Sequence, residues 1–271
     1  KIKFALRVNP DVDAKTHDKI STGRKGDKFG VDIDIAAEIY QIAASLPNIE
    51  VYGISTHIGS QITTIEPFTN AFKKIRNLCL ELKDQGHDVR SLDLGGGIGI
   101  NYQGESVIAV SQYAKMIKSL IADLDVQLVI APGRAIAGNC GLLATTLTYL
   151  KPTSFKNFAV IDAAMNDLAR PGLYDSYHEL VPVVKKAGHK DYYDLAGPIC
   201  ESTDILAKNR PLNEPQQGDI LLLLSAGAYG SSMSNEYNSR PLVPEVLVDG
   251  DSFKVIRRRP SFAEMIKYEI I

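Results

Sequence analysis

Hydrophobic positions in the first half of the chain follow two alternating patterns. Short apolar runs predict buried strands, and longer stretches with apolar residues three or four positions apart predict amphipathic helices. The predicted strands are 2–9, 51–57, 92–94 and 126–130, and the predicted helices are 32–46, 64–86 and 111–123. Strands that alternate with helices in this way are typical of βα units around a parallel sheet.

The first two helical stretches each place their apolar residues on one predicted face. The first follows a cap at Asp32 or Asp34, and the second begins at Thr64 with Pro67 in its first turn and stops at Gly86. The expected buried faces are Ile35, Ala36, Ile39, Ile42 and Ala43 in the first helix and Phe68, Phe72, Ile75, Leu78 and Leu82 in the second.

After about residue 140 the pattern becomes β-rich, with turns that contain Pro, Gly, Asn and Asp. The predicted strands are 142–150, 158–162, 179–184, 220–224, 245–248 and 253–256, with a short helix at 261–266. We therefore expect two domains, residues 1–139 and 140–271. A complete (β/α)8 barrel needs about 250 residues. Four βα units indicate either a smaller open sheet or the second half of a barrel, and we expect the sequence to be part of a longer protein.

Composition narrows the classes of partner and compartment. Lys and Arg number 30 against 32 Asp and Glu, a net charge of −2, so nothing favours a nucleic acid or an anionic membrane as partner. The three cysteines are widely spaced and fit a reduced, cytoplasmic protein, and no Cys/His spacing indicates a metal site. No apolar run reaches membrane-spanning length and no signal-peptide pattern is present.

Polar residues and glycines follow the predicted strands of the first domain. The third strand leads into Gly95-Gly96-Gly97-Ile98-Gly99, where backbone N–H groups can converge on an anion. By itself this run is equally compatible with a tight turn. The other strand ends carry Arg7, the stretch 57–61 with His57 and Ser60, and the stretch 132–134 with Arg134. Since chemistry lies at the carboxyl ends of strands in barrels and open α/β sheets, these ends together indicate a cofactor phosphate site.

Three turns of the second domain also carry reactive or charged side chains among small residues. They are 161–174, 197–202 and 225–230. As turns they need only break the chain, but small residues around one functional group also suit a ligand that approaches the backbone closely.

The motifs RVNP, KFG, HIGSQ, DLGGGIG, PGR, DAAMNDLARPGLYD, GPICES, SAGAYG and YNSRP occur in this order. In this set the chain resembles the diaminopimelate decarboxylases, pyridoxal-phosphate enzymes of the alanine-racemase-like barrel class that are related to ornithine and arginine decarboxylases. The resemblance covers essentially the whole sequence. Cys-Glu-Ser at 200–202 favours the diaminopimelate branch, since the ornithine branch typically has Cys-Asp-Gly there.

The resemblance implies an α/β-barrel fold, here the second half of a (β/α)8 barrel followed by a β domain. It also implies a lyase of lysine biosynthesis that converts meso-2,6-diaminopimelate to L-lysine and CO2, and a homodimer whose active sites are shared across the interface. The implied cofactor-binding residues are His57, Ser60, Gly95, Gly96, Gly97, Ala131, Gly133, Arg134 and Tyr229. The implied substrate-binding residues are Arg134, Arg170, Tyr174, Glu201 and Tyr229. The implied catalytic residues are Cys200, as proton donor, and His57, against the cofactor ring.

The sequence departs from the family pattern in two places. The Schiff-base lysine of the family lies before the matched region, and no lysine of this chain stands in its context. The family has Glu-Pro-Gly-Arg where this chain has Ala131-Pro132-Gly133-Arg134. That glutamate pairs with the pyridine nitrogen, and alanine cannot do so.

Two alternatives to the diaminopimelate reading follow from these departures. The first is a decarboxylase of ornithine, lysine or a related diamino acid, against which Glu201 and Arg170 argue. The second is a non-catalytic homologue or truncated fragment that binds the cofactor or a partner chain, which is consistent with both departures.

Overall fold

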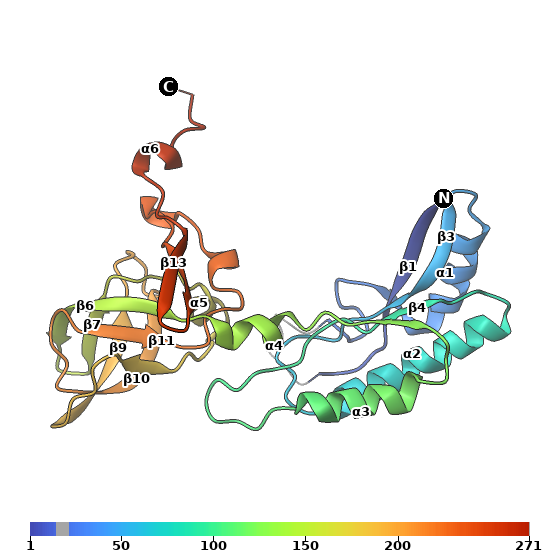
Figure 1. The fold of residues 1–271 in the computed structure, drawn as a ribbon, viewed down its shortest axis with the longest axis horizontal. Coiled ribbons are helices and arrows are strands. Elements are labelled where there is room, and N and C mark those ends of the chain that lie inside the picture. Colours follow the sequence, from blue (N-terminus) through green and yellow to red (C-terminus); the bar gives the residue numbers. More distant parts are fainter. Residues whose placement is uncertain (15–21, 271) are drawn as a thin grey trace. The chain divides into compact units, whose positions relative to one another are not determined.

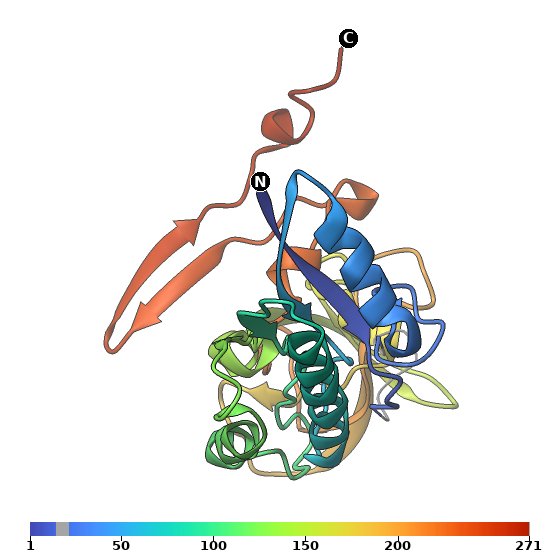
Figure 2. The same cartoon turned by 90° about the vertical axis from the view of Figure 1, so that its right-hand side faces the viewer.

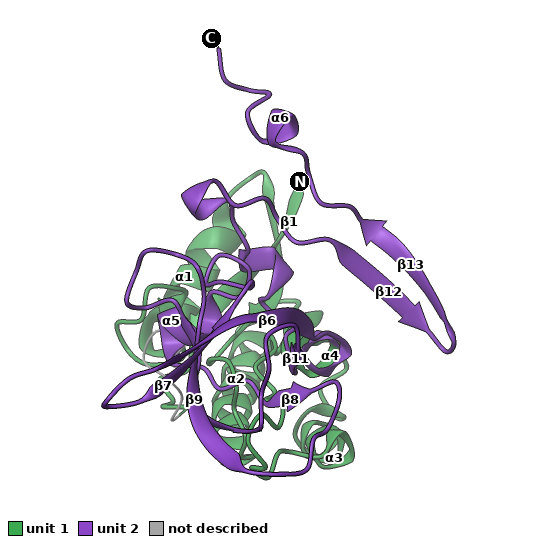
Figure 3. Ribbon diagram, turned by 90° about the vertical axis from the view of Figure 1, so that its left-hand side faces the viewer, with its two compact units in different colours: residues 1–136 green, residues 137–271 purple. Residues whose placement is uncertain are grey.

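The computed structural model describes residues 1–14 and 22–270 of the chain. These residues form two compact units, 1–136 and 137–271 (Figure 3). Among the described residues, none of the helices has the length and apolar character needed to cross a bilayer. Each unit has its own hydrophobic core and is described separately.

Unit 1 is built on a five-stranded parallel sheet with strand order β2-β1-β3-β4-β5. Its elements are β1 (Ile2–Asn9), β2 (Val31–Asp32), α1 (Ile33–Ser45), β3 (Ile49–Ser55), α2 (Glu66–Asp84), β4 (Ser91–Asp93), α3 (Val110–Ile121), β5 (Gln127–Val129) and α4 (Gly133–Ala137). The predicted strands and helices are present, with bounds that shift by a few residues. The two-residue strand β2 and the five-residue helix α4 had no counterpart in the predicted pattern, because both are too short to produce a clear apolar period.

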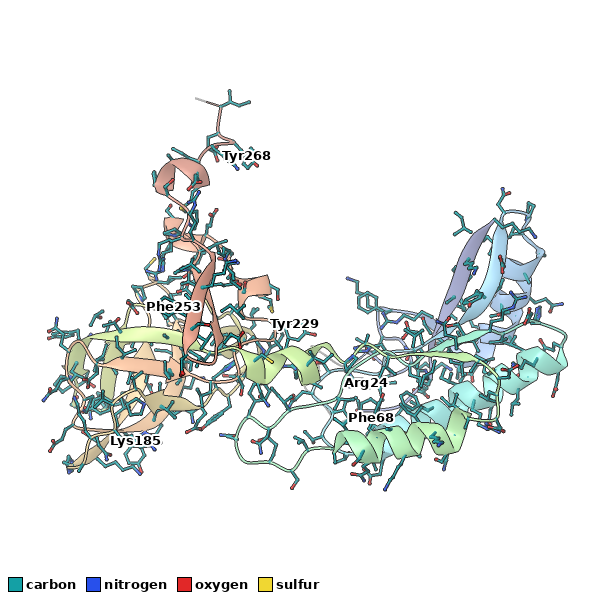
Figure 4. All side chains as sticks on the ribbon, in the orientation of Figure 1. Arg24, Phe68, Lys185, Tyr229, Phe253 and Tyr268 are labelled. Atoms are coloured by element: carbon teal, nitrogen blue, oxygen red, sulfur yellow. The ribbon has the colours of Figure 1, made fainter. Side chains whose placement is uncertain are left out.

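The core of unit 1 lies between the sheet and the helices. The predicted face of α2 is buried along its whole length, from Phe68 to Leu82. Helix α3 packs beside α2 (Figure 1) and places Tyr113 edge-on against Phe68, with ring centroids 5.1 Å apart. Phe68, labelled in Figure 4, has no exposed surface. Aromatic residues on two helices therefore close the core over the sheet.

The predicted face of α1 is wrong in part. Ile35 and Ile42 are 47% and 55% exposed, whereas the buried residues are Ala36, Tyr40 and Ala43. At 100° per residue, positions 36, 40 and 43 share a face and positions 35 and 42 lie roughly 100° away from it. Tyr40 takes the central place, and its ring meets His87 edge-on at 5.2 Å.

Strand β5 forms one edge of the sheet and exposes apolar side chains. Leu128, Val129 and Ile130 are 38–45% exposed. A groove of about 630 Å³ lies beside this strand and α3, and most of its lining is apolar. The sheet edge thus carries the exposed apolar surface that an incomplete barrel is expected to show.

Unit 2 contains a six-stranded sheet of order β10-β9-β7-β6-β11-β8, in which only β7 and β9 pair in parallel. Its strands are β6 (Leu143–Pro152), β7 (Asn157–Ile161), β8 (Leu180–Pro182), β9 (Lys190–Ala196), β10 (Ile205–Asn213) and β11 (Ile220–Leu223). A separate hairpin, β12 (Glu245–Asp249) and β13 (Ser252–Arg257), extends away from this sheet (Figure 2). The helices of the unit are α5 (Arg170–Tyr174) and α6 (Phe262–Met265).

Two of these strands, β9 and β10, were missed by the apolar pattern. In β9 only Leu195 is buried, and the strand contains charged residues and tyrosines. β10 includes Lys208, Arg210 and Pro211, and its register with β9 shifts twice. A strand with one polar face and irregular pairing gives no continuous apolar run, so single-sequence periodicity does not detect it.

Candidate active site

The glycine run after β4 is a tight turn packed against neighbouring backbone. Gly95 and Gly97 adopt φ of +66° and +106°, which favour glycine. A Cβ atom built on Gly95, Gly96 or Gly97 would lie within 2.4 Å of a backbone oxygen. No side chain fits at any of the three positions, so the run brings the ends of β3, β4 and β5 into direct contact.

Two N–H groups of this turn already have acceptors within the unit. Gly95 N–H donates to Asp93 Oδ1 at 2.9 Å, and Gly96 N–H donates to His57 Nδ1 at 3.2 Å. An anion at this turn would therefore compete with His57 and Asp93 for these donors. The expected cradle of three glycine N–H groups stays a prediction.

The hydrogen bond to Gly96 determines the state of the His57 ring. Since Nδ1 accepts, the proton of the neutral ring is on Nε2. Burial lowers the pKa of His57 and the Arg7 guanidinium lowers it further, while Asp93 acts in the opposite direction. A neutral, half-buried ring at the end of β3 is suited to stacking against a flat ligand.

Arg134, which follows β5, is hydrogen-bonded to residues that follow β3 and β4. Its side chain is only 6% exposed. It donates to Ser60 Oγ at 3.0 Å and to Tyr102 Oη at 2.7 Å, and these hydroxyls follow β3 and β4. A buried guanidinium with two hydroxyl groups is a donor set that matches a phosphate or carboxylate. Sequence reasoning assigned no role to Tyr102, although this residue comes directly after the glycine run.

Ala131 and Gly133 follow β5 on the same rim. The N–H of Ala131 donates to Gly95 O at 2.8 Å, which fixes its backbone against the glycine turn. Its methyl side chain offers no acceptor for a ring nitrogen. Gly133 begins α4, and a Cβ there would meet nothing within 4 Å.

In unit 2, Arg170 is held by a buried histidine. Arg170 begins α5 and is 5% exposed, and its NH1 lies 3.1 Å from His178 Nε2. His178 has no exposed surface, and its Nδ1 lies 2.9 Å from Leu224 O. Because a carbonyl oxygen only accepts, Nδ1 carries the proton and Nε2 accepts from Arg170. This contact fixes the guanidinium, and Tyr174 at the end of α5 is half-buried in the same short helix.

A second buried group, Asp204, ties two of the functional turns together. Its Oδ1 accepts from Met165 N–H at 2.6 Å and its Oδ2 accepts from Ile199 N–H at 2.7 Å. The side chain is 1% exposed, and a Cβ at Gly197 would lie 2.3 Å from Oδ2. Asp204 therefore joins the turn before Arg170 to the turn that carries Cys200, with glycine required beside it.

The remaining predicted residues are exposed on their turns. Cys200 and Glu201 follow Ile199 and are exposed. Tyr229, labelled in Figure 4, is 44% exposed and adopts φ of +59° in the turn 225–230. Within each unit the structure thus gathers the predicted residues at strand ends or on connected turns. Sequence reasoning missed the residues that hold them, Tyr102, His178 and Asp204, since their contacts join positions far apart in the chain.

Comparison with known proteins identifies the family. The profile described as "Pyridoxal-dependent decarboxylase, pyridoxal binding domain" matches residues 1–138. Two similar proteins are the diaminopimelate decarboxylases of Vibrio cholerae, 47% identical over 100% of this chain and 65% of its own length, and of Pseudomonas fluorescens, 48% identical over 98% and 64%. A crystal structure of diaminopimelate decarboxylase from Helicobacter pylori complexed with L-lysine superposes with a TM-score of 0.95 at 38% identity and covers 99% of this chain and 67% of that one.

The chain thus spans slightly less than two thirds of the length of these two curated relatives. The fold agrees with the expectation of a partial PLP-binding barrel followed by a sheet domain. The chain belongs to the pyridoxal-dependent decarboxylase family.

Proposed function

We propose that the protein acts as a diaminopimelate decarboxylase, a carboxy-lyase that converts meso-2,6-diaminopimelate to L-lysine and CO2. The observation that carries this proposal is 47% identity over the whole chain to a curated enzyme of that name. The structure of a relative in complex with L-lysine supports a site that accommodates the product.

Pyridoxal 5′-phosphate fits the residues of unit 1. The buried Arg134 guanidinium, Ser60 and Tyr102 supply donors for a phosphate group, and the neutral His57 ring supplies a flat surface beside them. The backbone of Gly95, Gly96 and Gly97 packs directly on the ends of the neighbouring strands, and the space beside Gly133 is open, with nothing within 4 Å of a Cβ. When bound, this cofactor supplies an electron sink for the charge left when CO2 departs. Ala131 has no carboxylate to pair with the ring nitrogen.

The residues of unit 2 would recognise and protonate the substrate. Arg170, fixed by His178, presents a cation for a carboxylate, and Arg134, Tyr174 and Tyr229 would take part in the same contact. Glu201 would bind the distal ammonium, a charge-assisted interaction that rejects substrates without that group. Cys200 would deliver a proton from its thiol to the carbon that has lost CO2.

The assembly we propose is a cytoplasmic homodimer with active sites shared across its interface. Cys200 and Glu201 are exposed in the single chain, as residues are that reach into the site of a partner subunit. We propose no nucleic acid and no membrane as partner.

A second candidate function rests on Ala131. A homologue without the ring-pairing carboxylate could bind the cofactor or a partner chain without turning over. Binding of pyridoxal phosphate together with absent decarboxylation would identify such a homologue.

The test is release of labelled CO2 from carboxyl-labelled meso-diaminopimelate by the full-length protein with pyridoxal phosphate, beside parallel assays with lysine and ornithine. We expect release from diaminopimelate alone. Release from ornithine or lysine at an equal rate would contradict the assigned substrate. Absence of release from all three, with the cofactor bound, would favour the non-catalytic homologue.

A further inference from the structure

A short turn of unit 2 outside the assigned site contacts two exposed residues of that site, Cys200 and Glu201. The residues Tyr237–Ser239 form a single 3-10 turn. Tyr237 Oη donates to Glu201 Oε1, and Asn238 Nδ2 lies 3.5 Å from Cys200 Sγ. Two adjacent residues of this turn thus contact two adjacent residues of the other.

The backbone of this turn is held in an uncommon conformation. Asn238 and Ser239 adopt φ of +58° and +55°, a region that costs most residues energy and that asparagine tolerates better. The conformation allows the side chains of Tyr237 and Asn238 to reach the same neighbouring turn.

The turn is anchored from both sides to the loop that precedes Arg170. Asn235 N–H donates to Asn166 O at 3.0 Å, and Arg240 Nε donates to Asn166 Oδ1 at 3.1 Å. Arg240 also donates to Asp162 O at 2.6 Å and forms an ion pair with the buried Asp167 at 3.5 Å. The flanking residues Asn235 and Arg240 are therefore held by the buried Asn166 and Asp167. The position of the turn does not depend on the exposed contacts of Tyr237.

The second oxygen of Glu201 also has a partner. Thr203 Oγ1 donates to Glu201 Oε2 at 3.2 Å. One carboxylate oxygen is thus bonded within its own turn and the other by Tyr237. Two hydroxyl donors, one on each oxygen, restrain the plane of the carboxylate, which limits the direction from which a cation can approach it.

We infer that Tyr237 and Asn238 are positioning residues that orient Glu201 and Cys200, so that Tyr237 contributes to recognition of a substrate's distal ammonium and Asn238 to the reactivity of the thiol. This inference rests on the proposed function. Tyr237 is 46% exposed, and hydrogen bonds between exposed groups contribute little to folding, so removing them tests the site and not the fold.

The first test compares Tyr237→Phe with the wild-type full-length holoenzyme on two substrates. For meso-diaminopimelate we expect KM to rise roughly tenfold with kcat little changed, since one hydrogen bond to a charged group is lost. For 2-aminopimelate, a poor substrate because it has no distal amine, the two proteins should have equal inhibition constants when it competes with meso-diaminopimelate. Tyr268→Phe, at a residue that is 83% exposed, is the matched control. An equal weakening of both ligands, or no rise in KM for meso-diaminopimelate, would contradict a role in ammonium recognition.

The second test needs no decarboxylase activity. Cys79 is buried and Cys140 and Cys200 are exposed, so a Cys140→Ser background simplifies alkylation by iodoacetamide, with the Cys200 peptide quantified by mass spectrometry. Amide donation to sulfur stabilises the negative charge that the sulfur carries as it attacks the reagent, so Asn238→Ala should slow alkylation about threefold at fixed pH. Asn213→Ala is the control at an exposed asparagine remote in sequence.

The two tests separate the inference from the function on which it rests. An unchanged or faster rate in Asn238→Ala would overturn the positioning role of Asn238, whatever the activity. If the wild-type holoenzyme releases no CO2 from diaminopimelate while Asn238→Ala slows alkylation, the proposed function fails and the positioning of the thiol stands.

Discussion

The two units build their candidate functional groups by different physical means. In unit 1 the geometry comes from backbone packed on backbone: the glycine turn leaves no room for a Cβ, and strand ends converge on Arg134. In unit 2 it comes from buried polar side chains, since Asp204 joins two turns and His178 holds the Arg170 guanidinium through hydrogen bonds. The first arrangement is rigid because alternatives clash, and the second because buried polar groups need their partners.

This difference would suit the two tasks that we propose for the units, cofactor binding for unit 1 and substrate binding for unit 2. A cofactor that is bound through many turnovers is served by a surface that cannot rearrange. A substrate that enters and leaves is served by side chains on turns, provided that those turns are themselves held. The difference also predicts which substitutions disrupt each unit. In unit 1 these are substitutions that cause a steric clash, and in unit 2 they are substitutions that remove a hydrogen-bond acceptor.

The largest effect is expected from Gly95→Ala. Its Cβ would lie 2.4 Å from Thr56 O at φ of +66°, so the substitution adds a clash to an unfavourable conformation. We expect a loss of roughly 3 kcal/mol or more in the free energy of unfolding. Gly104→Ala is the matched control, because Gly104 also has positive φ, +90°, but nothing within 4 Å. It should lose only about 1 kcal/mol. Equal losses in urea titrations of the two variants would show that packing at the glycine turn is not the determinant.

Prediction from sequence succeeded in unit 1 for the same reason that this turn is rigid. Local patterns encode local geometry: β1 has the predicted bounds, the α2 face is buried, and the glycine run marks a turn that only glycine can make. The predicted buried face of α1 was wrong in part because isoleucine was taken as a sign of burial, whereas Tyr40 occupies the core.

In unit 2 the sequence carries less local information. β9 and β10 have polar faces and irregular register, and the functional turns could be assigned only by resemblance. The residues that hold those turns act over long separations. Tyr237 is 36 positions from Glu201, and Asp204 is 39 from Met165. No periodicity connects such pairs, so only a folded chain reveals them.

Ala131 tests the proposed role of unit 1 in cofactor binding. Ala131→Glu should raise kcat for diaminopimelate roughly a hundredfold in the full-length holoenzyme, because a carboxylate would pair with the ring nitrogen. Ala131→Gln, which has similar size without the charge, should give no such gain. Unchanged turnover in Ala131→Glu would show that the ring nitrogen has another partner or needs none.

A smaller effect is expected when the acceptor of unit 2 is removed. Asp204→Asn places an amide where a carboxylate oxygen accepts a backbone N–H, so one of Met165 and Ile199 loses its acceptor. We expect a loss of about 2 kcal/mol in unfolding free energy, with faster hydrogen exchange at one of these amides. Asp175→Asn, at an exposed ion pair with Lys208, should change stability by less than about 0.5 kcal/mol. Unchanged exchange at both amides would contradict the role of Asp204.

The smallest effect is a pH dependence from unit 1. The pKa of His57 lies below its usual value of 6.5 in the folded chain, chiefly through burial. Below that value the unfolded chain therefore takes up more protons than the native one, and stability falls as the pH drops through 6.5 toward the lowered pKa. His57→Gln should reduce this fall between pH 7 and 5, and His189→Gln, at an exposed residue, should retain it. Parallel curves for wild type and His57→Gln would contradict the lowered pKa.

The most direct test of the proposed shared active site, in which Cys200 and Glu201 of one subunit reach the unit 1 residues of another, is complementation between two inactive variants of the full-length holoenzyme. His57→Ala removes the ring that follows β3 in unit 1, and Cys200→Ala removes the thiol in the turn 197–202 of unit 2. Random mixing of the two should form heterodimers in which one site of two is intact, and so restore about a quarter of wild-type CO2 release. No recovery in the mixture, with heterodimers verified by native mass spectrometry, would show that the two groups do not meet across a subunit interface.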